Sequence, residues 1–277
     1  MYAMVIFTFL LAIVLYGIAS ASMVYKLLVK NPSAELIPHI ATALGFAAHC
    51  ISLIWLFLLH KGMLFLQGSI ILLLVSWAVA AGALVLLVVM SDKGESYARY
   101  LVPLALLLFV ISWGMGVGLS TEVQKRLYLS VPLFVTHVAC FVISATCFIC
   151  SGVSSMLALS AQARLKSADP LSESLGKLPA LSTLKNVAHR SMLIGLPIYS
   201  FGLMIGILQA HMVNELWFIS PRVLSSFLLW LLVVLYLFMV YVVKAPVSQS
   251  ARIAMIVALC TVCLSVLSSI VPMFALV

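Results

Sequence analysis

Acidic side chains are scarce in this sequence: it has seven Asp and Glu among 277 residues, and none of them lies inside a long apolar run. Proton-coupled transporters carry ionisable groups within the membrane, so this scarcity argues against that class of protein. The chain also lacks a P-loop, an H-E-x-x-H zinc motif and a G-x-S-x-G nucleophile elbow. An enzyme with chemistry of its own is therefore not expected.

Long polar stretches are missing as well, since 65% of the residues are hydrophobic and only 8% are charged. Eight apolar stretches fill most of the chain: Val5–Tyr25, Leu36–Leu59, Leu64–Met90, Leu101–Leu119, Val131–Leu159, Met192–Ala210, Val223–Val243 and Ile253–Leu276. About 20 helical residues cross a hydrocarbon core about 30 Å thick, and a helix satisfies its own backbone hydrogen bonds there. The sequence predicts an all-α, polytopic helical bundle with about eight transmembrane helices in a lipid bilayer.

The net charge of +8 belongs to loops, so it is interpreted as a signal of membrane orientation and not of nucleic-acid binding. With eight helices, eleven basic residues fall on one side: Lys26, Lys30, Lys93, Arg99, Arg164, Lys166, Lys177, Lys185, Arg190, Lys244 and Arg252. Four fall on the other: Lys61, Lys125, Arg126 and Arg222. Because cytoplasmic loops carry the excess of Lys and Arg, this bias predicts that both termini are external.

One loop, residues 161–190, is longer than the others and contains Pro170, Gly176 and Pro179. It is interpreted as a cytoplasmic connector between a five-helix part, residues 1–160, and a three-helix part, residues 191–277, of a single transmembrane domain, residues 1–277. Apolar residues at helical spacing predict a helical lead-in at its end: Leu178, Leu181, Leu184 and Val187.

Glycines are spaced for close packing in the sixth apolar stretch. Gly202 and Gly206 are four residues apart, which places them on one helix face where a neighbouring helix can approach closely. Pro197 removes one backbone hydrogen bond and predicts a kink. Structural packing is the simpler interpretation of this pattern.

Histidine is the candidate metal-ligating residue type, because neutral imidazole binds haem iron. Three histidines lie near the predicted outer ends of helices: His60, His137 and His211. His49 lies deeper in its helix, where an ionisable side chain needs a partner. A bond to a neighbouring helix, or an ordinary place at the membrane interface, explains such residues equally well. His39 and His189 fall at the cytoplasmic ends and are interpreted as surface residues.

Two C-x-x-C pairs, Cys147/Cys150 and Cys260/Cys263, have the spacing of redox proteins. Both pairs lie inside apolar helices and lack the nearby cation that activates a thiol. A thiol-disulfide carrier is therefore a minor alternative. Four small residues below His137 follow helical spacing and indicate a close-packing stripe: Cys140, Ser144, Cys147 and Ser151.

Three strings in the second half of the chain carry a family resemblance. They are Leu178-Pro179 through Gly195-x-Pro197, Ser200, Gly202 and Gly206; Thr136-His137-Val138 with Ser144; and Trp217-Phe-Ile-Ser-Pro221-Arg222 with Trp230 and Tyr236. Together they resemble the CcsA/CcmC/HemX-type cytochrome c assembly family, whose members handle haem in membranes. His49 adds a weaker match in the first half.

The resemblance implies a protein that binds or presents haem at the external face of the bacterial cytoplasmic membrane. The implied haem-binding residues are His137, His49, His211, His60, Trp217, Arg126 and Lys125, with His137 and His49 as ligands of the iron. Basic side chains would pair with the propionates. The implied partners are apocytochrome c or other maturation subunits.

Departures from the family pattern favour its shorter, HemX-like branch. Ile219 and Ser220 stand where the tryptophan-rich segment has Trp and Asp, and Phe238 stands where a membrane histidine would follow Tyr236. The alternative function is regulatory, acting on haem synthesis through a cytoplasmic partner.

Overall fold

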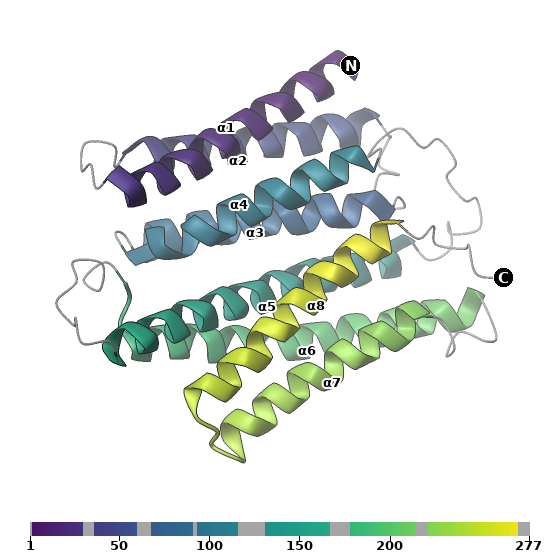
Figure 1. The fold of residues 1–277 in the computed structure, drawn as a ribbon. Helices are drawn as coiled ribbons and strands as arrows, with labels where there is room; N and C mark the ends of the chain where they lie inside the picture. Colours follow the sequence, from purple (N-terminus) through teal and green to yellow (C-terminus); the bar gives the residue numbers. More distant parts are fainter. Residues whose placement is uncertain are drawn as a thin grey trace. The chain divides into compact units, whose positions relative to one another are not determined.

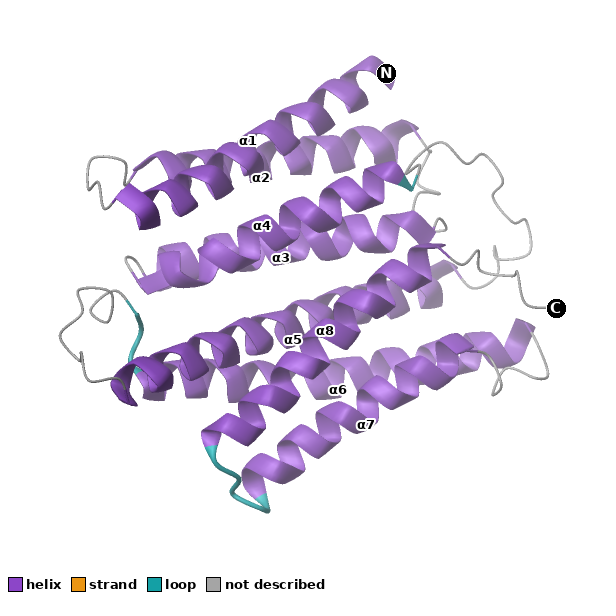
Figure 2. Cartoon of the chain, viewed as in Figure 1, coloured by secondary structure: helices purple, strands orange, loops and turns teal. Residues whose placement is uncertain are grey.

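The protein is described by a computed structural model that covers residues 2–29, 36–59, 68–90, 93–115, 131–166, 178–213 and 221–270. All regular structure in these ranges is helical (Figure 2). The helices are α1 (Tyr2–Val29), α2 (Leu36–Leu59), α3 (Gly68–Met90), α4 (Gly94–Gly114), α5 (Val131–Lys166), α6 (Leu181–Val213), α7 (Pro221–Tyr241) and α8 (Val247–Ile270). The predicted all-α class is confirmed.

Each of these eight described helices is long and apolar enough to cross a membrane. Large apolar side chains cover their outward faces; Val88 is 79% exposed and Met204 is 69% exposed. In water such surface would be costly, whereas lipid tails solvate it. The chain is therefore a multi-pass membrane protein.

The helices pack in two compact units, residues 1–123 with α1 to α4 and residues 124–277 with α5 to α8 (Figure 1). We call them unit 1 and unit 2. The boundary between the units lies between α4 and α5, and the predicted connector at residues 161–190 belongs to unit 2. Much of that segment is helical, because α5 continues to Lys166 and α6 begins at Leu181. The lead-in spacing from Leu181 to Val187 thus marks a true helix.

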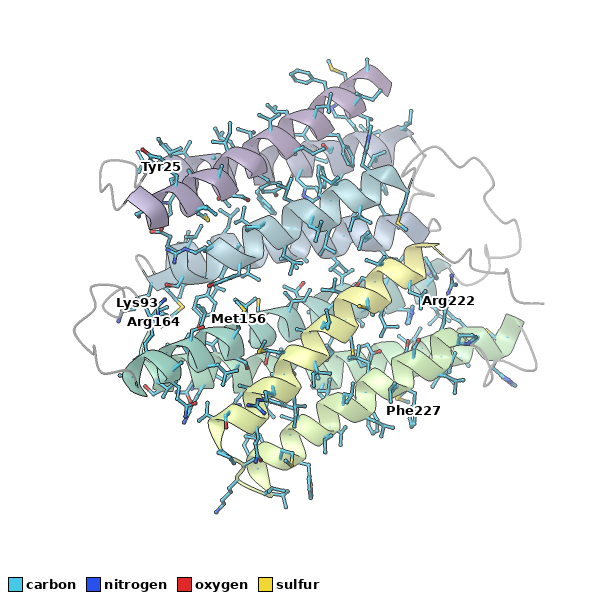
Figure 3. The ribbon with its side chains drawn as sticks, in the orientation of Figure 1. Tyr25, Lys93, Met156, Arg164, Arg222 and Phe227 are labelled. Carbon is cyan, nitrogen blue, oxygen red and sulfur yellow. The ribbon has the colours of Figure 1, made fainter. Side chains whose placement is uncertain are left out.

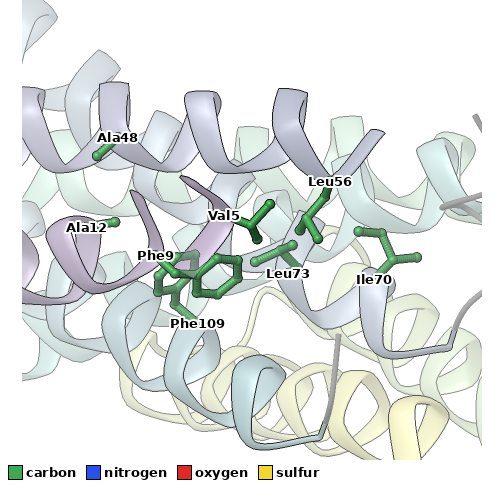
Figure 4. Close-up of a cluster of buried hydrophobic side chains, with 8 residues drawn as sticks. All are labelled: Val5, Phe9, Ala12, Ala48, Leu56, Ile70, Leu73 and Phe109. Atoms are coloured by element: carbon green, nitrogen blue, oxygen red, sulfur yellow. The ribbon is translucent and has the colours of Figure 1, made fainter. Parts of the chain in front are cut away.

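An apolar cluster holds unit 1 together at the centre of its four helices (Figure 4). The rings of Phe9 on α1 and Phe109 on α4 stack with centroids 4.4 Å apart. Leu56 of α2 and Leu73 of α3 belong to the same cluster and are at most 1% exposed. Stacked aromatic rings and close-packed aliphatic groups of this kind supply the dispersion energy that holds helices together in lipid.

An ion pair joins α1 to α4 at one end of unit 1. Lys26 Nζ lies 2.7 Å from Glu95 Oε2, and both side chains are nearly buried, at 11% and 12% exposed. Arg99 Nη2 lies 3.7 Å from the other oxygen of Glu95. The pairing lies in the first turn of α4, which begins at Gly94, ahead of the apolar stretch that starts at Leu101.

A short hairpin connects α3 to α4. Only three residues separate Met90 from Gly94, and a Cβ added to Gly94 would lie 2.2 Å from the carbonyl oxygen of Leu86. No side chain fits in that space, so glycine is required there. Midway along the helices, the Ser76 hydroxyl of α3 donates a hydrogen bond of 2.7 Å to the carbonyl oxygen of Ala105 on α4.

Basic side chains gather at one end of unit 2. Arg164 lies there near the end of α5, and Arg222 lies at the opposite end, at the start of α7 (Figure 3). Because α6 and α8 begin where α5 and α7 end, the first end also carries Lys185, Arg190, Lys244 and Arg252. We call it the basic end of unit 2.

Candidate functional site

Three glycines of α6 bring it into direct contact with α5. A Cβ added to Gly195 would lie 2.6 Å from a ring carbon of Phe148, and one added to Gly202 would lie 2.8 Å from Cys140 Cβ. At Gly206 an added Cβ would lie 2.6 Å from Cε1 of His137. The expectation that Gly202 and Gly206 admit a neighbouring helix is confirmed, and the neighbour is α5. Gly195 makes the same kind of contact, which was not predicted.

The imidazole of His137 bonds to the backbone of α6. Its Nδ1 lies 2.7 Å from the carbonyl oxygen of Gly202. A carbonyl oxygen only accepts, so Nδ1 carries a proton and donates it. In the neutral ring the lone pair is then on Nε2. A backbone carbonyl that fixes the tautomer in this way is the usual support of a metal-ligating histidine.

Below His137, the small residues of α5 continue the contact with α6. Cys140 packs on Gly202, Cys147 Cβ would be 3.1 Å from a Cβ at Gly195, and the Ser151 hydroxyl donates to the carbonyl oxygen of Ala188 at 2.9 Å. These contacts confirm the close-packing stripe at the positions where they are seen. The stripe sets the rotation of α5 and thereby the direction in which His137 faces.

His49 lies at the core of unit 1 with no exposed surface. Its Nδ1 is 3.5 Å from the Tyr16 hydroxyl, and its ring centroid is 4.3 Å from that of Phe109. Its Nε2 is buried and has no hydrogen-bond partner in the described residues. The nitrogen can bind a metal only in the tautomer that leaves it unprotonated, and the surrounding rings enclose it.

His211 lies in the last turn of α6. Its side chain is exposed and interacts with another group of the protein. Since α6 runs antiparallel to α5 and Gly206 meets His137, His211 lies at the same end of unit 2 as His137. His60, Lys125, Arg126 and Trp217 lie outside the described residues.

Two bonds hold α7 against α6 beside this end. The Trp230 indole donates to the Ser200 hydroxyl at 2.9 Å, and the Tyr199 hydroxyl donates to the carbonyl oxygen of Ser226 at 3.0 Å. Ser200 and Trp230 are two of the positions that carried the family resemblance. Phe238 is 50% exposed, so the position without its expected histidine faces away from the core of the unit.

A family model described as cytochrome C assembly protein matches residues 36–272 of the chain. The chain belongs to the cytochrome c assembly protein family. This protein therefore functions in cytochrome c biogenesis. Members of its family are associated with haem handling and with the cytochrome c maturation machinery. No curated protein and no solved structure matches it.

The described part of this cytochrome c assembly protein holds no group of three or more His, Cys, Asp or Glu side chains arranged for a metal ion. All six cysteines, which lie within it, are free thiols. Candidate iron ligation in these ranges therefore rests on single histidines. A single histidine is enough to bind haem iron, because the porphyrin supplies four nitrogen ligands and the protein supplies only axial ligands.

The interpretation of His189 as a surface residue was wrong. Its side chain is half-buried on α6, and its Nδ1 lies 2.5 Å from the Tyr236 hydroxyl of α7. The two residues are 47 positions apart, so no local pattern in the sequence indicates the contact.

Proposed function

We propose that this cytochrome c assembly protein binds haem at the end of unit 2 where α5 begins and α6 ends, with Nε2 of His137 as an axial ligand. The observation that carries the proposal is the hydrogen bond between His137 Nδ1 and the Gly202 carbonyl, which leaves the Nε2 lone pair for iron. Haem is here a cargo. The role of the chain is to hold and release it, without chemistry of its own.

The basic end of unit 2 lies opposite the end that carries His137, and this arrangement supports an external haem site. Lys and Arg concentrate on cytoplasmic surfaces, so the end of unit 2 that carries His137 and His211 belongs outside. On this proposal the membrane is the bacterial cytoplasmic membrane. His60, Trp217, Lys125 and Arg126 stay predictions of the sequence as haem-binding residues. The haem passes to apocytochrome c or to another maturation subunit.

Within the proposal, His49 is a second ligand candidate because the family resemblance includes it and its ring is buried in unit 1. Its enclosure by Tyr16 and Phe109 makes it the weaker one, since a ligand would have to displace packed rings. Regulation of haem synthesis through a cytoplasmic partner is the second candidate function. The substitutions Ile219 and Ser220 in the tryptophan segment favour it.

The test is the Soret absorption of the detergent-purified full chain. We expect His137→Gln to lose most of the haem, because an amide can keep a hydrogen bond to Gly202 but is a poor iron ligand. His137→Ala should regain part of the spectrum with exogenous imidazole. His39→Gln serves as the control. A normal spectrum in His137→Gln together with its loss in His49→Ala would move the site to unit 1. No effect of either change would favour the regulatory function.

A further inference from the structure

A pocket of about 210 Å³ lies at the basic end of unit 2, where α6 begins, α7 ends and α8 begins. Its polar lining consists of Lys185, His189, Lys244 and Ser250. Val240 and Val247 form an apolar wall. The volume is many times the space that one water molecule needs, so the pocket can admit a polyatomic group.

Among the described residues, the charges that line this pocket have one sign. Lys185 and Lys244 come from different helix ends, and no carboxylate is among the lining residues. The described ranges of unit 2 contain no Asp or Glu at all. Two ammonium groups that share a pocket without a carboxylate repel each other and raise the local positive potential, which an anion would relieve.

Lys244 occupies a backbone conformation that favours glycine. Its φ is 53°, the positive value at the tight turn between α7 and α8. Glycine adopts such values freely, whereas a side chain makes them costly. The lysine at this position places an ammonium group at the pocket at the expense of fold stability. Strain of this kind is a reason to look for a function of the side chain.

His189 adds a third nitrogen group to the lining. The hydroxyl of Tyr236 lies 2.5 Å from its Nδ1 and anchors the ring between α6 and α7. When the hydroxyl donates to Nδ1, the ring proton is on Nε2, which becomes the donor available to a ligand. The pocket thus combines two point charges with one oriented donor.

We propose that this pocket binds a phosphate group, supplied by the headgroup of an anionic phospholipid. Phosphate oxygens accept several charge-assisted hydrogen bonds at once, so one phosphate group can pair with the nitrogen donors of Lys185, His189 and Lys244. The membrane-spanning helices end here, and the neighbouring side chains of Tyr241, Val242 and Val243 are at least 51% exposed, a surface that acyl chains would cover. Basic pockets between transmembrane helices on the cytoplasmic side are suited to lipid headgroups.

The test is titration of the detergent-purified full chain with dioctanoyl phosphatidylglycerol, with bound lipid measured by native mass spectrometry. We expect Lys185→Gln to weaken binding about fivefold, the effect of one basic residue near a lipid surface. Arg252→Gln is the matched control, because this exposed residue of α8 does not line the pocket. Equal binding by wild type and Lys185→Gln would overturn the proposal.

The Lys244→Gly variant tests the ammonium group separately from the strained backbone, because it removes the charge and relieves the strain. Glycine suits a φ of 53°, so this variant should melt at the wild-type temperature or higher while its lipid binding falls about fivefold. Unchanged lipid binding in Lys244→Gly would overturn the proposal.

Two further titrations identify the source of the phosphate. Dioctanoyl phosphatidylcholine, which has no net charge, should bind less well than phosphatidylglycerol. Inorganic phosphate should fail to displace the lipid if the acyl chains contribute. Displacement by millimolar phosphate, lost again in Lys185→Gln, would assign the pocket to a soluble phosphate ligand and overturn the lipid assignment.

Discussion

The Nδ1 of His137 on α5 lies 2.7 Å from the carbonyl oxygen of Gly202 on α6, while the His137 ring covers Gly206 one helical turn further on. The histidine is therefore held by the backbone of its neighbour. Any change in the spacing between α5 and α6 must move the ring. This dependence makes the glycines of α6 a means of testing the site without removing the histidine.

We expect Gly206→Ala to reduce haem retention, because the added methyl group would lie 2.6 Å from Cε1 of His137 and push the ring away from Gly202. Gly195→Ala is the matched control. Its methyl group would meet the Phe148 ring, also at 2.6 Å, far along the helix from His137. The measurement is the Soret absorbance per mole of protein, compared between the two variants once their melting temperatures are shown to be equal. An equal loss in both variants would mean that helix packing, and not the position of His137, governs haem retention.

The basic end of unit 2 predicts the topology of the chain. A reporter inserted near Ser172 should be cytoplasmic and one fused at Val277 external, since Lys and Arg accumulate on the cytoplasmic side. Alkaline phosphatase and green fluorescent protein fusions would measure this in bacterial cells. The reverse pattern would place His137 in the cytoplasm and contradict delivery of haem to the outer face.

The thiols of α5 are expected to serve packing. Replacing Cys147 and Cys150 together by Ala should leave cytochrome c maturation near its wild-type level, because Cys147 contacts α6 as a small side chain and both thiols are free. Haem staining of matured cytochrome c measures the outcome. If maturation stops while the amount of the double variant is normal, the thiol-disulfide carrier becomes the better hypothesis.

Glu95→Gln should destabilise unit 1 by about 2 kcal/mol, because it leaves the largely buried ammonium of Lys26 without its carboxylate. The double variant with Lys26→Gln should recover part of the loss, since the largely buried ammonium group is then gone and only Arg99 lacks the Glu95 carboxylate. Lys93→Gln, at an exposed position, is the control. Thermal unfolding in one detergent gives all four values. A Glu95→Gln variant as stable as Lys93→Gln would show that the ion pair does not stabilise the unit.

Helix number and the α6 packing face could be predicted from the sequence because both depend on local patterns. Apolar length predicts a span, and α2 has the bounds of its apolar stretch, Leu36–Leu59. The spacing of Gly202 and Gly206 predicts a packing face in the same way. Helix ends were predicted less well where charged residues of different helices pair. An example is α4, because Glu95 in its first turn pairs with Lys26 of α1.

The polar contacts could not be predicted, because each joins residues far apart in the chain. The pairing of His189 with Tyr236 and the pocket around Lys244 exist only after α6, α7 and α8 have packed. The tautomer of His137 likewise depends on a carbonyl 65 residues away. The sequence can nominate a histidine as a ligand, but the lone pair it offers is a property of the fold.

The α3–α4 hairpin has a consequence for how the chain enters the bilayer. Three residues can span only about 10 Å, so the start of α4 must lie close to the end of α3 once both helices have formed. The Ser76 hydroxyl, costly to bury alone in hydrocarbon, finds its acceptor within this same pair, at Ala105. The two helices can therefore leave the translocation machinery together as one insertion unit with this polar group satisfied, and α1 and α2 can pack onto them afterwards.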